Sequence, residues 1–164
     1  MVKIVNLHEH VNISHRNKNK LKDGNDKNVN GRHYSVGAVI KKGKKYLMID
    51  RKLFPPGYAG IAGHMQKDES PEKALKRELK EETNYDLISR KLLFHEIING
   101  NECRAGFNTH EWYLFECKCK GKLRIAKKEE KSIGYISKEK IKLLHKNKKL
   151  EPVWEYWFKK LKII

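Results

Sequence analysis

The stretch that decides the fold is residues 63–85, which read GHMQKDESPEKALKRELKEETNY. Ser70 and Pro71 favour a helix start, because serine accepts hydrogen bonds from the free amides and proline fits the first helical position. Asn84 is a suitable end, because asparagine tolerates the left-handed conformation at a helix C-terminus. The pattern therefore predicts a helix from Ser70 to Asn84.

The acids of this helix are placed unusually. At about 100° per residue, three carboxylates border the apolar face, and the lysines lie on the other side. They belong to Glu78, Glu81 and Glu82. Like charges at this spacing cost roughly 0.2–0.5 kcal/mol per pair when exposed, and burial raises the cost unless a cation lies between them. The carboxylates suit a hard divalent metal, although pairing with Arg77 and nearby lysines would also explain them.

The surrounding spacing resembles the signature of the Nudix hydrolases. It consists of Gly63, five residues, Glu69, seven residues, and then the continuous stretch RELKEETNY from Arg77 to Tyr85. Every charged position of that signature is present. Asn84 stands where the family has glycine, and asparagine is the mildest replacement at a left-handed position.

The resemblance implies an α/β (α+β) fold in which a mixed β-sheet is sandwiched between helices. It also implies a metal-dependent pyrophosphohydrolase that cleaves a nucleoside diphosphate linked to another moiety by water attack on phosphorus. The implied cofactor is Mg²⁺ or Mn²⁺, with Glu78, Glu82 and the backbone carbonyl of Ala62 as ligands. The substrate would be a phosphorylated nucleotide.

The implied catalytic set contains Glu69, Arg77, Glu78 and Glu81. In the family pattern, Glu69 and Arg77 would hold each other and orient the helix. Glu81 would be a further metal ligand or one bridged by water. A general base from a loop has two candidates, Glu129 and Glu130, which can equally be read as solvated charges in a lysine-rich segment.

Three basic side chains flank the expected phosphate loop and are candidate substrate contacts: Arg51, Lys52 and His64. Three aromatic residues are candidates for stacking on a base, although a core or rim position explains such residues more often. They are Phe54, Tyr58 and Trp112.

Residues 1–31 differ in composition from the rest and are expected to form an N-terminal strand and a polar basic loop. Residues 32–164 are expected to form the Nudix-like domain. Four histidines lie in or near the first segment, at positions His8, His10, His15 and His33. Their spacing matches no metal-ligand motif, so we interpret them as surface residues.

Outside the signature, hydrophobic patterning predicts strands at 34–40, 46–49, 87–98, 111–119 and 133–136. The turn 42–44 would join the first two strands, and a polar segment, 99–108, would precede the fourth. Residues 53–63 are rich in proline and glycine and predict a loop. Helices are expected at 137–145 and 152–161, the latter with an aromatic face that suits docking on a core.

Three cysteines form no even disulfide framework, and no apolar run is long enough for a signal peptide or a membrane span. These features predict a cytoplasmic protein of a reducing compartment, with no membrane partner.

The formal net charge is +17. Residues 63–85 nevertheless hold six acids and five bases, so the signature is a near-neutral island in a basic chain. Such a field attracts phosphorylated substrates or RNA. The charge keeps open an RNA-directed Nudix enzyme acting on a cap or 5′ end, and an inactive Nudix scaffold that binds nucleic acid. An isomerase of isoprenoid diphosphates is a weaker alternative, since no cysteine lies near the loop. The oligomeric state is left open.

Overall fold

A computed structural model describes residues 1–7, 25–128 and 130–164. The elements are, in chain order, β1 (Lys3–Asn6), β2 (Asn28–Val29), β3 (Arg32–Lys42), β4 (Lys45–Arg51), β5 (Gly57–Ala59), β6 (Ile61–His64), α1 (Pro71–Thr83), β7 (Asp86–Asn99), β8 (Thr109–Lys120), β9 (Glu130–Ser137), α2 (Lys138–Lys146) and α3 (Pro152–Lys160). His8, His10, His15 and Glu129, which the sequence singles out, lie outside the described residues.

The strands form a mixed sheet in the order β1-β7-β8-β3-β4-β5, with β2 and β6 also paired to β3 and β9 paired to β4. β3 and β8 run parallel, from His33 opposite His110 to Ile40 opposite Cys117. β1 is a parallel edge strand on β7, so the strand expected near the N-terminus is confirmed for Lys3–Asn6.

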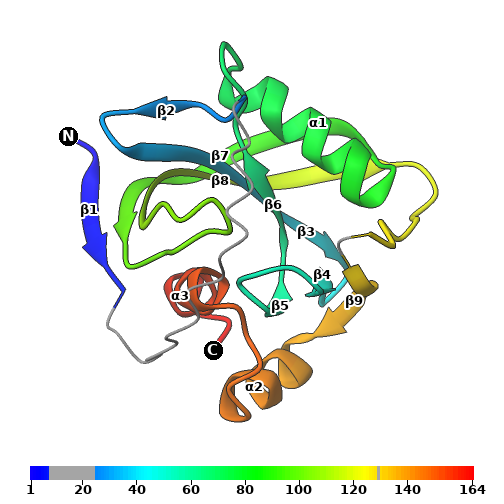
Figure 1. The fold of residues 1–164 in the computed structure, drawn as a ribbon. Helices are drawn as coiled ribbons and strands as arrows, with labels where there is room; N and C mark the ends of the chain where they lie inside the picture. Colours follow the sequence, from blue (N-terminus) through cyan, green and yellow to red (C-terminus); the bar gives the residue numbers. More distant parts are fainter. Residues whose placement is uncertain (8–24, 129) are drawn as a thin grey trace.

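Helices cover both faces of the sheet, with α1 on one side and α3 on the other (Figure 1). Two glycines mark the contacts. A Cβ at Gly63 would collide with Glu78 of α1, whereas a Cβ at Gly37 would lie 3.5 Å from the Trp154 ring of α3. The predicted sandwich of a mixed sheet between helices is therefore confirmed.

The predicted helix in the signature stretch has the expected ends. Ser70 accepts a hydrogen bond from the Lys73 amide at 3.2 Å, and Asn84 adopts the left-handed conformation with φ 63°. Ala74, Leu75 and Leu79 are buried against the sheet. The aromatic face of α3 is buried in the same way, with Trp157 fully inaccessible to solvent.

The expectation of a loop over residues 53–63 is wrong for its second half, which forms β5 and β6. Gly60 and Gly63 do not form turns. They leave room for side chains of the helices, so their presence does not indicate a loop. A Cβ at Gly60 would lie 2.3 Å from the Trp154 ring, and Gly63 is equally crowded by Glu78. In the described part of the chain, no helix is both long and apolar enough to cross a membrane.

Candidate active site

The carboxylates of α1 reach the strand β6, which runs beneath the helix. The Ala62 amide donates a hydrogen bond to Glu82 Oε2 at 3.2 Å. Glu78 packs on Gly63 so closely that only glycine fits: a Cβ at that position would lie 2.0 Å from Glu78 Cδ. The spacing between Gly63 and the helix acids thus reflects a direct contact.

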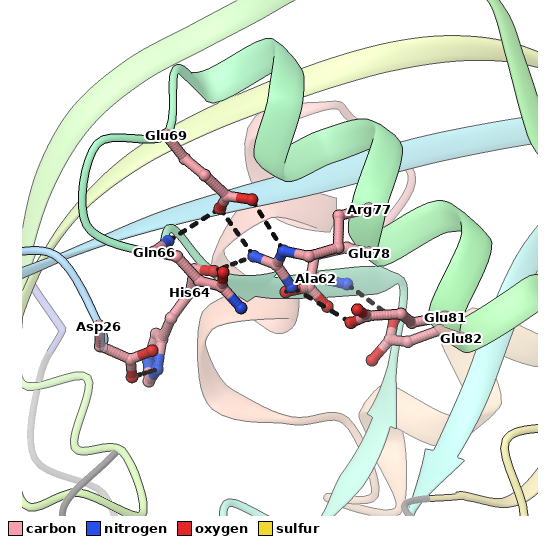
Figure 2. Close-up of polar contacts among 9 residues, drawn as sticks. All are labelled: Asp26, Ala62, His64, Gln66, Glu69, Arg77, Glu78, Glu81 and Glu82. Carbon is pink, nitrogen blue, oxygen red and sulfur yellow. Dashed lines mark hydrogen bonds and ion pairs between the residues drawn. The ribbon is translucent and has the colours of Figure 1, made fainter. Parts of the chain in front are cut away.

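Arg77 joins the helix to the loop before it (Figure 2). Its Nε and Nη2 donate to the two carboxylate oxygens of Glu69, each at 2.9 Å, while Nη2 also donates to the His64 carbonyl at 2.8 Å. Glu69 in turn accepts a hydrogen bond from the Gln66 amide at 2.8 Å. Two parallel bonds between a guanidinium and a carboxylate fix orientation as well as distance. The pair therefore fixes the loop relative to the helix.

The other guanidinium nitrogen of Arg77 contacts the metal-ligand candidates. Nη1 donates to Glu78 Oε1 and, at 3.2 Å, to Glu81 Oε2. The Glu69 pairing outweighs the cost of burial and lowers the pKa of that carboxyl below its usual value. Arg77 thus lies between the carboxylate that orients it and the carboxylates that it helps to hold.

Of the three helix acids, Glu82 is buried and Glu78 is partly buried, with its side chain 12% exposed. Glu82 is 5% exposed, and burial followed by repulsion from Glu78 raises the pKa of the Glu82 carboxyl well above its usual value. Burial likewise raises the pKa of Glu78 to about 7, although Arg77 opposes the rise. Glu81 differs, since its side chain is 58% exposed.

Arg51 and Glu130 approach Glu82 from the sheet. They lie opposite each other where β4 pairs with β9, and Glu130 is fully buried. The positive charge of Arg51 opposes the raised pKa of Glu82, whereas the charge of Glu130 adds to it. Glu130, one of the two loop-base candidates, is therefore near the helix acids. The Ala126 amide donates a hydrogen bond to Glu130 Oε2 at 3.3 Å.

A cavity of about 190 Å³ has Ala62 and Gly63 of β6 in its wall together with Trp154 of α3. Residues from distant parts of the chain line it, among them Arg51, Phe54, Ala62, His64, Trp112 and Trp154. Trp112 is 5% exposed and donates from Nε1 to Asn101 Oδ1 at 2.9 Å, which fixes its ring. The cavity is the natural place for a substrate next to the acid cluster.

Of the three candidate phosphate contacts, two line the cavity and one does not. Arg51 and His64 line the cavity. Lys52 is exposed and donates to the Lys127 carbonyl instead. Among the aromatic candidates, Phe54 and Trp112 line the cavity, whereas Tyr58 is half-buried in β5.

The residues present suit a hard divalent cation. Glu78 and Glu82 supply oxygen donors, and mutual repulsion of buried carboxylates is relieved when a cation binds between them. Burial is the main cause of the raised pKa of both groups, and repulsion from Glu78 adds to the rise at Glu82. The Ala62 amide lies beside Glu82, and the role of the Ala62 carbonyl as a metal ligand stays a prediction.

A group of residues on the cavity side was missed by the sequence reasoning. It contains His33, His64, Cys103 and His110. The surface interpretation of His33 is wrong, since its side chain is 3% exposed. Strand register brings the three histidines together, and the connection between β7 and β8 adds Cys103, so no short motif reveals the group.

Comparison with known proteins agrees with the fold and the site. The family model described as the NUDIX domain matches residues 31–158. The chain therefore belongs to the Nudix family, and its intact signature is that of a hydrolase acting on pyrophosphate bonds. A search of curated proteins found no match.

Solved structures with the same fold include several Nudix proteins. A NUDIX hydrolase from Nitrosomonas europaea is 21% identical, with TM-score 0.62, over 76% of this chain and 84% of that one. The NUDIX domain of Shewanella oneidensis NrtR, complexed with ADP ribose, is 16% identical, with TM-score 0.63, over 80% and 86%. A MutT NUDIX hydrolase from Burkholderia pseudomallei is 20% identical, with TM-score 0.58, over 66% and 84%.

Proposed function

We propose that this protein is a Mg²⁺- or Mn²⁺-dependent pyrophosphohydrolase whose substrate is a nucleoside diphosphate linked to another moiety. The observation that carries the proposal is the pair formed by buried Glu82 and partly buried Glu78, held against β6 beside Ala62 and Gly63. Glu82 is buried and is repelled by the charge of Glu78, and such a pair favours a bound divalent cation over a purely structural role. The neighbouring cavity and Arg51 support a phosphorylated substrate.

In this proposal Glu78, Glu82 and the Ala62 carbonyl hold the metal, and Glu81 assists from the exposed end of the cluster. The bound ion would neutralise phosphate charge and lower the pKa of a coordinated water. Glu69 and Arg77 orient the helix that carries the ligands.

The side chains around the cavity have separate tasks. Arg51 binds phosphate oxygens, for which a planar guanidinium is well shaped. His64 adds a phosphate contact at the cavity wall. Glu130 is the candidate that accepts the proton of the attacking water, because it is buried close to Glu82. Glu129 is the second candidate for this general base, on the evidence of the sequence alone.

The test is a comparison of Glu82→Gln with Glu72→Gln. Glutamine keeps the size of Glu82 but cannot supply a carboxylate, so we expect at least about a hundredfold loss of Mg²⁺-dependent kcat/KM. Glu72 lies on the same helix and pairs with Lys76 and Arg90 at the surface, so Glu72→Gln should retain full activity. Equal turnover by Glu82→Gln and the wild type would disprove the metal assignment.

The substrate is best identified by a release assay. Nucleoside triphosphates, ADP-ribose, dinucleoside polyphosphates and capped RNA would be incubated with Mg²⁺ or Mn²⁺, and phosphate or mononucleotide release would be measured. The solved NrtR domain was complexed with ADP ribose, which makes ADP-ribose a natural first member of the panel.

The net charge of +17 favours a second candidate, an RNA-directed Nudix enzyme or an RNA-binding scaffold. If lysines neutralise RNA phosphates, affinity falls steeply as salt rises, because counterions are released on binding. A flat salt dependence would exclude this candidate, and binding without cap or 5′-end hydrolysis would indicate the scaffold.

Free thiols at Cys103, Cys117 and Cys119 support the cytoplasmic setting that we propose.

A further inference from the structure

Four potential metal ligands meet on the cavity face of the sheet, away from the carboxylates of α1. They are His33 of β3, His64 of β6, His110 of β8 and Cys103 in the connection between β7 and β8. One ligand atom from each lies within 4.8 Å of the others, and Cys103 Sγ is 3.8 Å from His33 Nδ1.

The sheet register explains why the three imidazoles converge. His33 and His110 are direct neighbours across the parallel pair β3 and β8. Ser35, two residues after His33 and therefore on the same face, is opposite His64 on β6. Three adjacent strands thus present one histidine each to the same face of the sheet.

The connection between β7 and β8 carries the thiol to this face. A tight turn shapes it, since the Gly106 amide donates to the Cys103 carbonyl at 2.8 Å and the Cys103 amide donates to the Phe107 carbonyl at 2.9 Å. The Phe107 ring stacks on His33 with centroids 3.7 Å apart. The backbone hydrogen bonds of this turn therefore fix Cys103 next to the histidines.

Burial makes this cluster costly unless something binds it. His110 is 1% exposed, and neither of its ring nitrogens has a hydrogen-bond partner among the described residues. A buried polar group without a partner costs about 1–3 kcal/mol. A metal bonded to one ring nitrogen would remove much of that cost.

Asp26 supplies the kind of support that metal-bound histidines usually have. Its Oδ2 lies 2.7 Å from His64 Nδ1, and Figure 2 shows the two side chains facing each other. This bond orients the ring and leaves Nε2 available for a metal. Residues 25–27 are themselves fixed, since the Lys27 amide donates to the Met65 carbonyl at 2.8 Å and the Lys67 amide donates to the Asn25 carbonyl at 2.8 Å.

We propose that His33, His64, Cys103 and His110 form a structural zinc site, separate from the carboxylate site of the Nudix signature. One thiolate with three imidazoles is a nitrogen and sulfur donor set, which suits Zn²⁺ and not Mg²⁺. Zinc bond lengths of about 2.0–2.3 Å place tetrahedral ligand atoms roughly 3.3–3.6 Å apart. The observed separations need only a small inward movement of the side chains.

The site would connect the N-terminal segment, the β7–β8 connection and β6. His64 directly follows Gly63, and its carbonyl accepts the bond from Arg77 Nη2 at 2.8 Å. Zinc on the His64 ring would therefore fix the end of the strand on which Glu78 packs. The zinc ligands differ from the carboxylates of the proposed hydrolysis, and the one shared residue is His64, whose ring would bind zinc in place of a phosphate.

The test begins with metal analysis of the untagged full chain after dialysis against a mild chelator. We expect roughly one zinc per chain in the wild type, and the same in Glu82→Gln and in Cys117→Ser, a buried cysteine elsewhere on β8. Cys103→Ser should reduce zinc occupancy at least tenfold. A variant with His8, His10 and His15 changed to alanine should keep its zinc, which excludes binding by those three histidines.

Cobalt substitution gives a readout that does not depend on activity, and its wild-type spectrum needs no mutant. Co²⁺ in the wild type should show the strong visible bands of tetrahedral coordination and a thiolate charge-transfer band, and the latter should be lost in Cys103→Ser. Asp26→Asn keeps all four ligands and should weaken zinc affinity 10–100-fold against a competing chelator.

Three results would overturn the site: no retained zinc in the wild type, octahedral cobalt without a thiolate band, or unchanged occupancy in Cys103→Ser. In a metal-free protein, Cys103 would instead be a reactive thiol. Burial opposes its ionisation, but the surrounding histidines prevail and lower the pKa of the thiol to about 3. Rapid alkylation of Cys103 without metal loss would establish that alternative and reject the zinc site.

Discussion

The carboxylate of Glu78 occupies the space above the Cα of Gly63. A Cβ at Gly63 would lie 2.2 and 2.3 Å from its two carboxylate oxygens. A strand position and a helix position fifteen residues apart therefore form one contact, and the glycine serves to bring the acid down to the level of β6.

We expect Gly63→Ala to displace Glu78 and lower kcat/KM by about a hundredfold, the usual cost of moving a catalytic group by about 1 Å. Overpacking should also cost about 1–3 kcal/mol of stability. Gly134→Ala is the control, because a Cβ there meets no atom within 4 Å. Steady-state kinetics and chemical denaturation would measure both effects, and full activity of Gly63→Ala would refute the contact.

Glu69 predicts a particular dependence of stability on pH. Its pKa in the folded protein lies below the usual 4.5, chiefly because Arg77 donates to it. The unfolded chain therefore binds the proton first, and stability is full above pH 4.5 and falls as pH drops toward the lower folded value. Glu69→Gln should flatten this part of the curve. Urea unfolding at a series of pH values would show it, and an unchanged acid slope in the variant would contradict the prediction.

Arg51 and Lys52 are neighbours in sequence but differ in position. Arg51 lines the cavity, whereas Lys52 is exposed and donates to the Lys127 carbonyl. We expect Arg51→Ala to raise KM about tenfold or more by removing a charged contact to phosphate, and Lys52→Ala to have a smaller effect. Lys44→Ala, in an exposed turn, controls for loss of net charge. A larger effect at Lys52 than at Arg51 would reverse the assignment.

Trp157 supplies a stability test far from the helix acids. It is fully buried, stacks on Phe94 with centroids 5.8 Å apart, and its Nε1 has no hydrogen-bond partner among the described residues. Trp157→Ala should cost about 3–5 kcal/mol by leaving a cavity. Trp157→Phe should cost much less, because it also removes a buried donor that lacks a partner. Denaturation midpoints would rank the two variants, and equal losses would contradict this reading.

Local rules predicted α1 well. The caps at Ser70 and Asn84 act within one helical turn, so the sequence alone contains the information that sets them. Helical periodicity places both Glu81 and Glu82 at the border of the apolar face, and the structure buries Glu82 but exposes Glu81. Two residues adjacent in sequence differ by about 100° around the helix axis, which separates the buried side from the solvent.

Long-range pairing could not be predicted in the same way. The meeting of His33, His64 and His110 depends on which residues stand opposite each other across β8, β3 and β6. A slip of one residue would move each side chain to the other face of the sheet. No local pattern in one sequence specifies that register, so the cluster cannot be predicted from it, and the proline and glycine content around β6 predicts a loop instead of a strand.

The cavity has a consequence for the order in which the enzyme becomes complete during synthesis. Its wall includes Ser35 near the start of β3, Trp112 on β8, and Glu151 and Trp154 at the beginning of α3. Most of the chain must leave the ribosome before the last of these residues can take its place. A nascent chain that already contains the whole Nudix signature would hold its carboxylates over an unfinished pocket, and hydrolysis would begin only after α3 docks.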